Sequence, residues 1–385
     1  ASEDAAPGSA DDAMRADGMP GDELGVGDGG EDATTTDATT TDATLGDAPI
    51  ESSSDATSDG APETDTGVTD AGVDAAPLDC TLLGASGEPL ELGCTGLYAS
   101  WETRTIASDL LAFDPGIHLW SDGAAKSRWI RLPAGQKIDT SNMDEWTFPA
   151  GTRFWKEFRL GGLKVETRML WKQTTSNFSW VRVTYAWSQD QSTATELTTG
   201  QTNVWGTTYE IPSQNDCTTC HQGRLDGVLG FEAIGLSSAG ATGETMARLI
   251  ADALITDAPA TPLVIPGNAT ESAALGWLHA NCGNSCHSAS NYALAINTGF
   301  RMRLNAAQLS TVTGTDTYTT AVNVASTYQP TPDAGLLRIK PADPAHSCVH
   351  YRDGSRVPSE QMPPLGTHIV DVAGLQLVDN WINTL

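Results

Sequence analysis

The first 79 residues of this 385-residue chain limit its fold most, because they lack the side chains that build a core. They contain 21 acidic residues, a single basic residue (Arg15), and no aromatic residue, histidine or cysteine. Such a segment buries too little apolar surface to offset the roughly 1–2 kcal/mol per residue that ordering costs. We therefore expect residues 1–79 to be a disordered acidic linker and the fold to lie within residues 80–385.

This linker also accounts for 20 of the 28 net negative charges of the chain. No run of ~18 apolar residues is present, so we expect no transmembrane segment, and the acidic balance argues against nucleic acid as a partner. A self-repelling spacer of this kind suits a lipoprotein-like tether between an anchor and a working domain.

Residues 80–215 predict a β-rich, tryptophan-containing domain. Nine of the eleven tryptophans lie between Trp101 and Trp205. Residues 180–187 alternate between apolar and polar positions, and residues 154–160 and 163–171 flank a Gly-Gly pair that predicts a hairpin. We expect an antiparallel sandwich or a barrel-like sheet.

Cys80 and Cys94 open this domain and flank a glycine-rich turn. A disulfide between them would close a short loop and imply an oxidising compartment, periplasmic or extracellular in a bacterium. Two buried free thiols are the alternative.

From residue 216 the pattern changes to helical periodicity, in residues 245–254, 271–280 and 372–385. The sequence therefore predicts an α+β multidomain protein, with a short segment at 216–265 and a mainly helical domain at 266–385.

Cys217-Thr-Thr-Cys220-His221 is the strongest chemical signal in the chain. Two thiols at this spacing can bond the two vinyl groups of one haem, and the adjacent histidine can then bind the iron. Zinc would require a second Cys/His pair, and a thioredoxin-type site would require a βαβ context; neither is apparent. We predict a covalently attached haem c at this motif.

Cys282-Gly-Asn-Ser-Cys286-His287 is one residue longer and predicts a second haem c. Met362, in a proline-rich segment before the last expected helix, is its candidate second axial ligand. Cys348 leaves the cysteine count odd; it is a pairing candidate for Cys282 or a buried thiol. A copper site is the alternative, drawn from Cys286 or Cys348 with His287, His350 and Met362.

The distal ligand of the first haem is left open by the sequence, with His118, Met246 and a vacant position as the candidates. A cluster at Ser121-Asp122-Gly suggests either a substrate site formed by Asp122, Lys126 and Arg128 or, as we prefer, a tight turn held by an ion pair.

Several further motifs make residues 100–385 resemble a family of exported dihaem c-type cytochromes, in which a β-rich N-terminal domain precedes a cytochrome c domain. The motifs are residues 119–129, 148–152 with Lys156 and Phe158, 166–170, 185–187, 211–213 and 229–230. The resemblance implies haem at Cys217, Cys220 and His221 and at Cys286 and His287, and at Cys282 if the longer spacing is tolerated. It implies electron transfer to a partner protein or terminal acceptor. A dihaem enzyme with an open first haem, and a copper-binding surface protein, are the alternatives.

Overall fold

The hairpin predicted at the Gly-Gly pair forms the centre of the structure. In the computed structural model, which describes residues 77–331 and 334–385, β5 (Arg153–Leu160) and β6 (Leu163–Lys172) are antiparallel neighbours. Gly161 and Gly162 join them with φ angles of 55° and 88°. Two consecutive positive φ angles are what a two-residue type I′ turn requires, and glycine adopts them at little cost.

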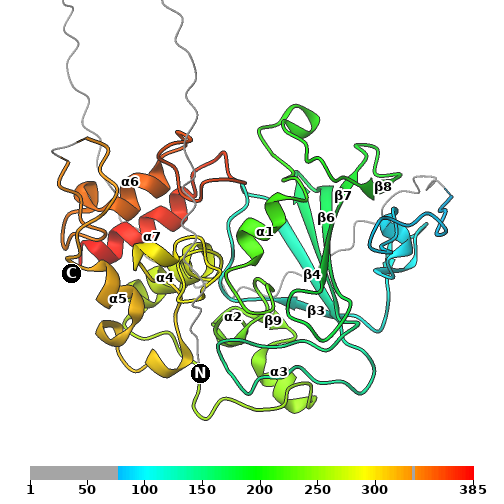
Figure 1. Cartoon of the computed structure of the whole chain (residues 1–385), viewed down its shortest axis with the longest axis horizontal. Coiled ribbons are helices and arrows are strands. Elements are labelled where there is room, and N and C mark those ends of the chain that lie inside the picture. The colour runs from blue at the N-terminus through cyan, green and yellow to red at the C-terminus, as the bar shows by residue number, and fades with distance from the viewer. Residues whose placement is uncertain (1–76, 332–333) are drawn as a thin grey trace, which may run out of the picture. The chain divides into compact units, whose positions relative to one another are not determined.

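The hairpin extends into a seven-stranded antiparallel sheet in the order β8-β7-β6-β5-β4-β3-β9 (Figure 1). The antiparallel, β-rich character is thus confirmed. The seven strands form an open sheet, however, and not the expected sandwich or barrel. The reason is that the described segments around it mostly form turns and loops, including η1 (Leu92–Cys94) and η2 (Val204–Gly206). The remaining strands are β3 (Leu111–Asp114), β4 (Ala125–Arg131), β7 (Trp180–Trp187), β8 (Ala194–Glu196), β9 (Thr242–Gly243) and, in a separate pair, β1 (Tyr98–Ser100) and β2 (Thr105–Ile106).

The two faces of the sheet differ in chemistry. On one face, alternate residues of neighbouring strands, among them Trp155, Met169 and Tyr185, form a buried apolar cluster. On the other face Lys156 and Arg168 are cross-strand partners. This second face is the one that meets the candidate functional residues.

Residues of the expected segment 216–265 pack onto the same sheet. They form α1 (Asp216–His221), α2 (Ala233–Ser237), the edge strand β9 and α3 (Met246–Ala251). Leu236 and Leu249, from α2 and α3, join Phe113 and Phe154 of the sheet in one core. The helix predicted at 245–254 is confirmed as α3.

The C-terminal residues are built around two packed helices, α4 (Ala269–Leu278) and α7 (Val372–Ile382). Leu275, Leu278 and Trp381 are fully buried where these helices meet. A capping box starts α4: the Asn268 side chain accepts from the Glu271 amide, and the Glu271 carboxylate accepts from the Asn268 amide. Both helices confirm the helical periodicity of the sequence.

The expectation of a mainly helical domain at 266–385 is nevertheless not supported. Among the described residues of this range, the α-helices besides α4 and α7 are α5 (Asp316–Ala321) and α6 (Cys348–Gly354), of six and seven residues. The other regular elements are a π-helical turn, η3 (His279–Gly283), and 3-10 turns at η4 (Ile296–Thr298), η5 (Ala306–Gln308), η6 (Val312–Gly314) and η7 (Pro344–His346). The intervening sequence is rich in Thr, Ser, Asn, Gly and Pro, whose side chains compete with helical hydrogen bonding or break it.

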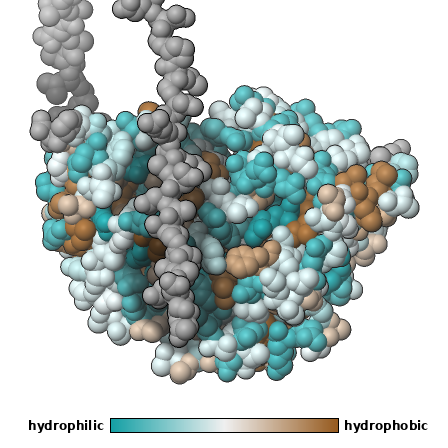
Figure 2. Space-filling model, in the orientation of Figure 1, coloured by the Kyte–Doolittle hydropathy of each residue, from teal (hydrophilic) through white to brown (hydrophobic). Residues whose placement is uncertain are grey.

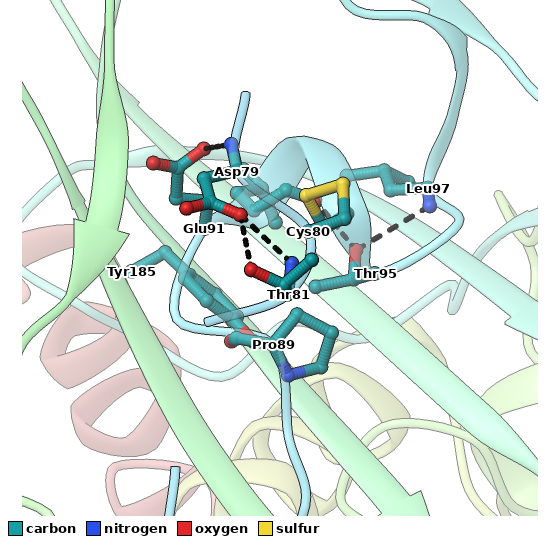
Figure 3. The surroundings of a disulfide bond; sticks show 10 residues. Asp79, Cys80, Thr81, Pro89, Glu91, Thr95, Leu97 and Tyr185 are labelled. Atoms are coloured by element: carbon teal, nitrogen blue, oxygen red, sulfur yellow. Dashed lines mark hydrogen bonds between the residues drawn. A yellow bond between two sulfur atoms is a disulfide. The ribbon is translucent and has the colours of Figure 1, made fainter. Parts of the chain in front are cut away.

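Cys80 and Cys94 form the predicted disulfide, with their Cα atoms 5.3 Å apart (Figure 3). The segment that they close is anchored to the sheet by Tyr185, whose hydroxyl donates to the Pro89 carbonyl at 2.8 Å. The expected linker at 1–79 lies outside the described residues, apart from residues 77–79.

None of the helices within residues 77–331 and 334–385 combines the length and apolar character needed to cross a bilayer. The face shown in Figure 2 is largely polar, with apolar patches scattered over it. Side chains that stay exposed include Leu83 and Phe178.

Candidate haem sites

The first Cys-x-x-Cys-His motif forms α1, which lies over the face of the sheet that carries Lys156 and Arg168. Its start is fixed by Asp216, whose carboxylate accepts hydrogen bonds from the amide and the hydroxyl of Ser213. The Gln214 side-chain amide donates to the carbonyl of Arg182 in β7 at 2.9 Å and ties the motif to the sheet. Cys217 and Cys220 are free, partly buried thiols.

His221 is oriented as an iron ligand would be. Its Nδ1 atom lies 2.5 Å from the Gly227 carbonyl oxygen. Because a carbonyl can only accept, Nδ1 carries the proton and Nε2 keeps a free lone pair. Burial lowers the pKa of His221 to about 3, so the imidazole is neutral at physiological pH.

The two thiols and His221 line a hollow that opens to solvent. One wall is the sheet, which contributes Lys156 and Arg168 among largely apolar neighbours. Another wall is the chain segment 363–367. The space suits a large, flat cofactor held by a few polar groups. We call this hollow the first pocket.

The longer second motif follows directly from α4 through the π-helical turn η3. The His287 amide donates to the Cys282 carbonyl, five residues earlier, at 2.9 Å. The Asn284 amide donates in the same way to His279. A π-type turn accommodates one residue more than an α-helical turn, so the helix absorbs the additional residue of this motif. The longer spacing is therefore compatible with the local backbone.

His287 repeats the arrangement of His221. Its Nδ1 atom lies 3.2 Å from the Phe300 carbonyl oxygen, which again leaves Nε2 as the free nitrogen. Burial lowers the pKa of His287 to about 4. His287 lines a second hollow with Cys282, Cys286 and Met362. We call this hollow the second pocket, and the structure thus brings together all the residues that were predicted for the second haem.

The two pockets are adjacent and share part of their lining. Asn281, Cys286, Pro363 and Pro364 belong to both. The Met362 segment therefore lies between the two candidate sites.

The distal candidates for the first haem lie elsewhere. His118 is 58% exposed, contacts Asp114 at 3.2 Å and lines a different surface hollow. Met246 is buried in the apolar core that α2 and α3 form with the sheet. Neither lines the first pocket.

The copper set is only partly assembled. Cys348 is a free, buried thiol that lines the second pocket. His350 does not line it and is held by Asp379, with Nδ1 and Oδ1 2.7 Å apart. Within the described ranges, no group of three or more His, Cys, Asp or Glu side chains is arranged to hold a metal ion.

Asp122 has a role that the sequence did not reveal. It does form a turn, with φ 48°, but its carboxylate accepts hydrogen bonds from the amides of His368 and Ile369, at 2.9 to 3.1 Å. The ion pair of this region instead joins Arg128 to Asp114. Asp122 thus anchors the segment that follows Met362.

Trp120 strengthens the same anchor. Its amide donates to the side-chain oxygen of Asn281 in η3 at 2.7 Å. Its indole nitrogen donates to the Ile369 carbonyl at 2.9 Å. Lys156 was also missed as a site residue. The period-two pattern of β5 could have placed it on the face of Phe154 and Phe158.

Haem fits the residues present in both pockets: each offers two thiols beside a neutral imidazole with a free Nε2 atom, on the wall of a largely apolar hollow. Comparisons with protein-family models, curated proteins and solved structures found no match for this chain.

Proposed function

We propose that this chain is an exported dihaem c-type cytochrome that transfers single electrons. The observation that carries the proposal is the repetition of one arrangement in two adjacent pockets. Each pocket joins a thiol pair to a histidine whose Nδ1 is bonded to a backbone carbonyl. In each case the backbone carbonyl, of Gly227 or Phe300, fixes the ring orientation and the tautomer that iron binding needs.

The haem would supply reversible one-electron chemistry, and the chain would supply attachment, axial ligands and burial. Cys217, Cys220 and His221 would hold the first haem. Cys282, Cys286 and His287 would hold the second, with Met362 as its other axial ligand. The shared wall of the pockets suits electron transfer between them, with a redox partner protein or a terminal acceptor beyond.

Export is supported by the disulfide between Cys80 and Cys94, since such bonds persist in oxidising compartments. A periplasmic or outer-surface location fits, with the acidic residues 1–79 as a tether to an anchor. The resemblance of residues 100–385 to exported dihaem cytochromes points in the same direction. The copper-binding alternative is less well supported, because His350 is directed to Asp379.

The test is to produce the full chain in a host with cytochrome c maturation and to measure haem per protein by the pyridine haemochrome method. Two haems per chain are expected, with haem mass on the peptide of Cys217 and Cys220 and on that of Cys282 and Cys286. Colourless protein, or unmodified peptides, would contradict the proposal. Metal analysis of the same sample decides between iron and copper.

A further inference from the structure

Lys156 is a half-buried lysine on the central strand β5, and it lines the first pocket. It stands in one cross-strand row with Arg128 on β4 and Arg168 on β6. It lines the first pocket together with His221. The two side chains come from different layers, His221 from α1 and Lys156 from β5, so they reach the pocket from different walls.

The ammonium group of Lys156 makes no hydrogen bond or salt bridge to any residue of the described ranges. Its neighbours are different. Lys126 donates to the carbonyls of Leu119 at 2.9 Å and Ala124 at 3.3 Å. Arg168 forms a two-point contact with the Glu166 carboxylate, at 2.6 and 2.7 Å. A polar side chain that lines a pocket and has no partner in the protein is available to bind a ligand there.

The surroundings also favour the uncharged amine. Burial, together with the positive charges of Arg128, Lys126 and Arg168, lowers the pKa of Lys156 well below its usual value. An unprotonated amine carries a lone pair, which a metal can accept.

From this position and its missing protein partner, we propose that Lys156 is the distal ligand of the first haem iron, opposite His221. The inference rests on the proposed function. The Nζ lone pair would form a dative bond to the iron and displace a water molecule. The oxidation state of the iron would not change. The first haem would then be closed on both sides, and it would differ from the His/Met-ligated second haem.

The experiment compares the full-length wild type with three variants produced in a cytochrome c maturation host. Lys156→Ala removes the amine, whereas Lys156→Arg keeps a positive charge that does not ligate iron. Lys126→Ala is the matched control, because Lys126 is a neighbouring half-buried lysine whose amine donates to backbone carbonyls. Spin state is read by electron paramagnetic resonance, open coordination by carbon monoxide binding to the reduced protein, and haem attachment by peptide mass.

In the wild type and in Lys126→Ala, we expect low-spin haem and no carbon monoxide binding. In Lys156→Ala and Lys156→Arg, we expect about half of the haem to become high-spin and to bind carbon monoxide, since one of two haems loses a ligand. Unchanged spectra in Lys156→Ala would overturn the inference, and rescue by Lys156→Arg would show that the residue pairs with a haem propionate instead.

The peptide masses separate these results from a failure of the proposed function. Haem on the Cys217–Cys220 peptide with unaltered spectra in Lys156→Ala refutes only the lysine ligand. Absence of haem from that peptide in the wild type refutes the proposed first site and the lysine ligand together.

Discussion

The two candidate haem pockets have the same proximal side but different opposite walls. On the proximal side, His221 and His287 each follow a thiol pair and each bond a backbone carbonyl through Nδ1. On the other side, the first pocket has a β-sheet with basic residues such as Lys156, and the second has Met362 in a loop. The Cys/His motif thus recurs on different supports. If both pockets hold haem as we propose, the opposite walls would give the two sites different redox properties.

The supports also differ in how they are held. The sheet wall consists of paired strands whose register is fixed over seven residue pairs between β4 and β5. The Met362 segment has no such pairing and depends on side-chain anchors, of which Asp122 makes the most contacts. We therefore expect the first site to fail through loss of its attachment residues, and the second to fail through movement of its loop.

The largest expected effect is the loss of a whole haem. Replacing both Cys217 and Cys220 with serine removes the thioether bonds of the first site, and haem per protein should fall by about half. The matched variant, Cys282→Ser with Cys286→Ser, should remove the other half. Pyridine haemochrome measurement with peptide mass mapping checks both variants. If either variant keeps two haems per chain, the assignment of that pocket is wrong.

Met362→Leu tests the difference between the opposite walls. Leucine is close in size but offers no sulfur, so the second haem should lose its thioether ligand. Thioether ligation raises the potential, so one midpoint potential should fall by on the order of 100 mV within the ~0.8 V range that axial ligands span. Met302, which lines the same pocket, provides the control variant Met302→Leu. A redox titration in which both variants match the wild type would exclude Met362 as a ligand.

The sequence predicted local features well where a residue pattern fixes the backbone directly. The Gly161–Gly162 turn, the disulfide between Cys80 and Cys94, and the α7 stripe all depend on neighbours close in the chain. The sequence overestimated helix after residue 278, because short apolar runs there pack as loops around α4 and α7. The prediction of a sandwich or barrel was wrong for a related reason. Alternation of apolar and polar residues identifies strands, but it does not determine how the strands assemble into sheets.

Contacts between distant parts of the chain escaped the sequence analysis. Asp122 and His368 lie 246 residues apart, and no local pattern reports that the carboxylate of the one accepts from the amide of the other. Lys156 faces the His221 pocket only because β5 is central in the sheet and α1 covers it. The motif residues could be singled out from the sequence because the chemistry proposed for them depends on spacing within one short segment, and their haem attachment stays a prediction.

Asp353, which lines the second pocket, should make the free energy of unfolding depend on pH. Burial raises the pKa of Asp353 to about 7, above an unfolded value near 4. The folded protein then binds one more proton than the unfolded chain between these values. The free energy of unfolding should therefore fall by roughly 1.4 kcal/mol per pH unit at most from about pH 4 to 7. The Asp353→Asn variant should lack this slope.

Urea unfolding of the haem-loaded protein at a series of pH values checks this prediction. The wild type and Asp353→Asn should have their stabilities closest at acidic pH and furthest apart above pH 7, with the variant the more stable. Parallel curves across the range would show that Asp353 does not titrate as its burial implies.

Asp122→Asn tests the anchor of the Met362 segment. Asparagine tolerates the left-handed backbone at this position, so the change removes mainly the charge that the amides of His368 and Ile369 contact. We expect a loss of about 1–2 kcal/mol in unfolding free energy, with a weaker iron–thioether absorption band. Asp190→Asn, in an exposed turn, is the control. An unchanged thioether band would mean that the segment is held without Asp122.

The smallest effect is expected from Cys348→Ser, and it decides how the second haem is attached. Cys348 and Cys282 are both free thiols that line the second pocket. The hydrogen bond from the His287 amide to the Cys282 carbonyl keeps Cys282 close to His287 in the π-type turn. If both Cys282 and Cys286 bond haem, the variant keeps two haems and loses the only reactive thiol of the wild type, at a cost of about 1 kcal/mol. If Cys282 is instead paired with Cys348, the wild type has no reactive thiol and the variant gains one at Cys282. Thiol counting on denatured protein distinguishes the two, and we expect one thiol in the wild type and none in the variant.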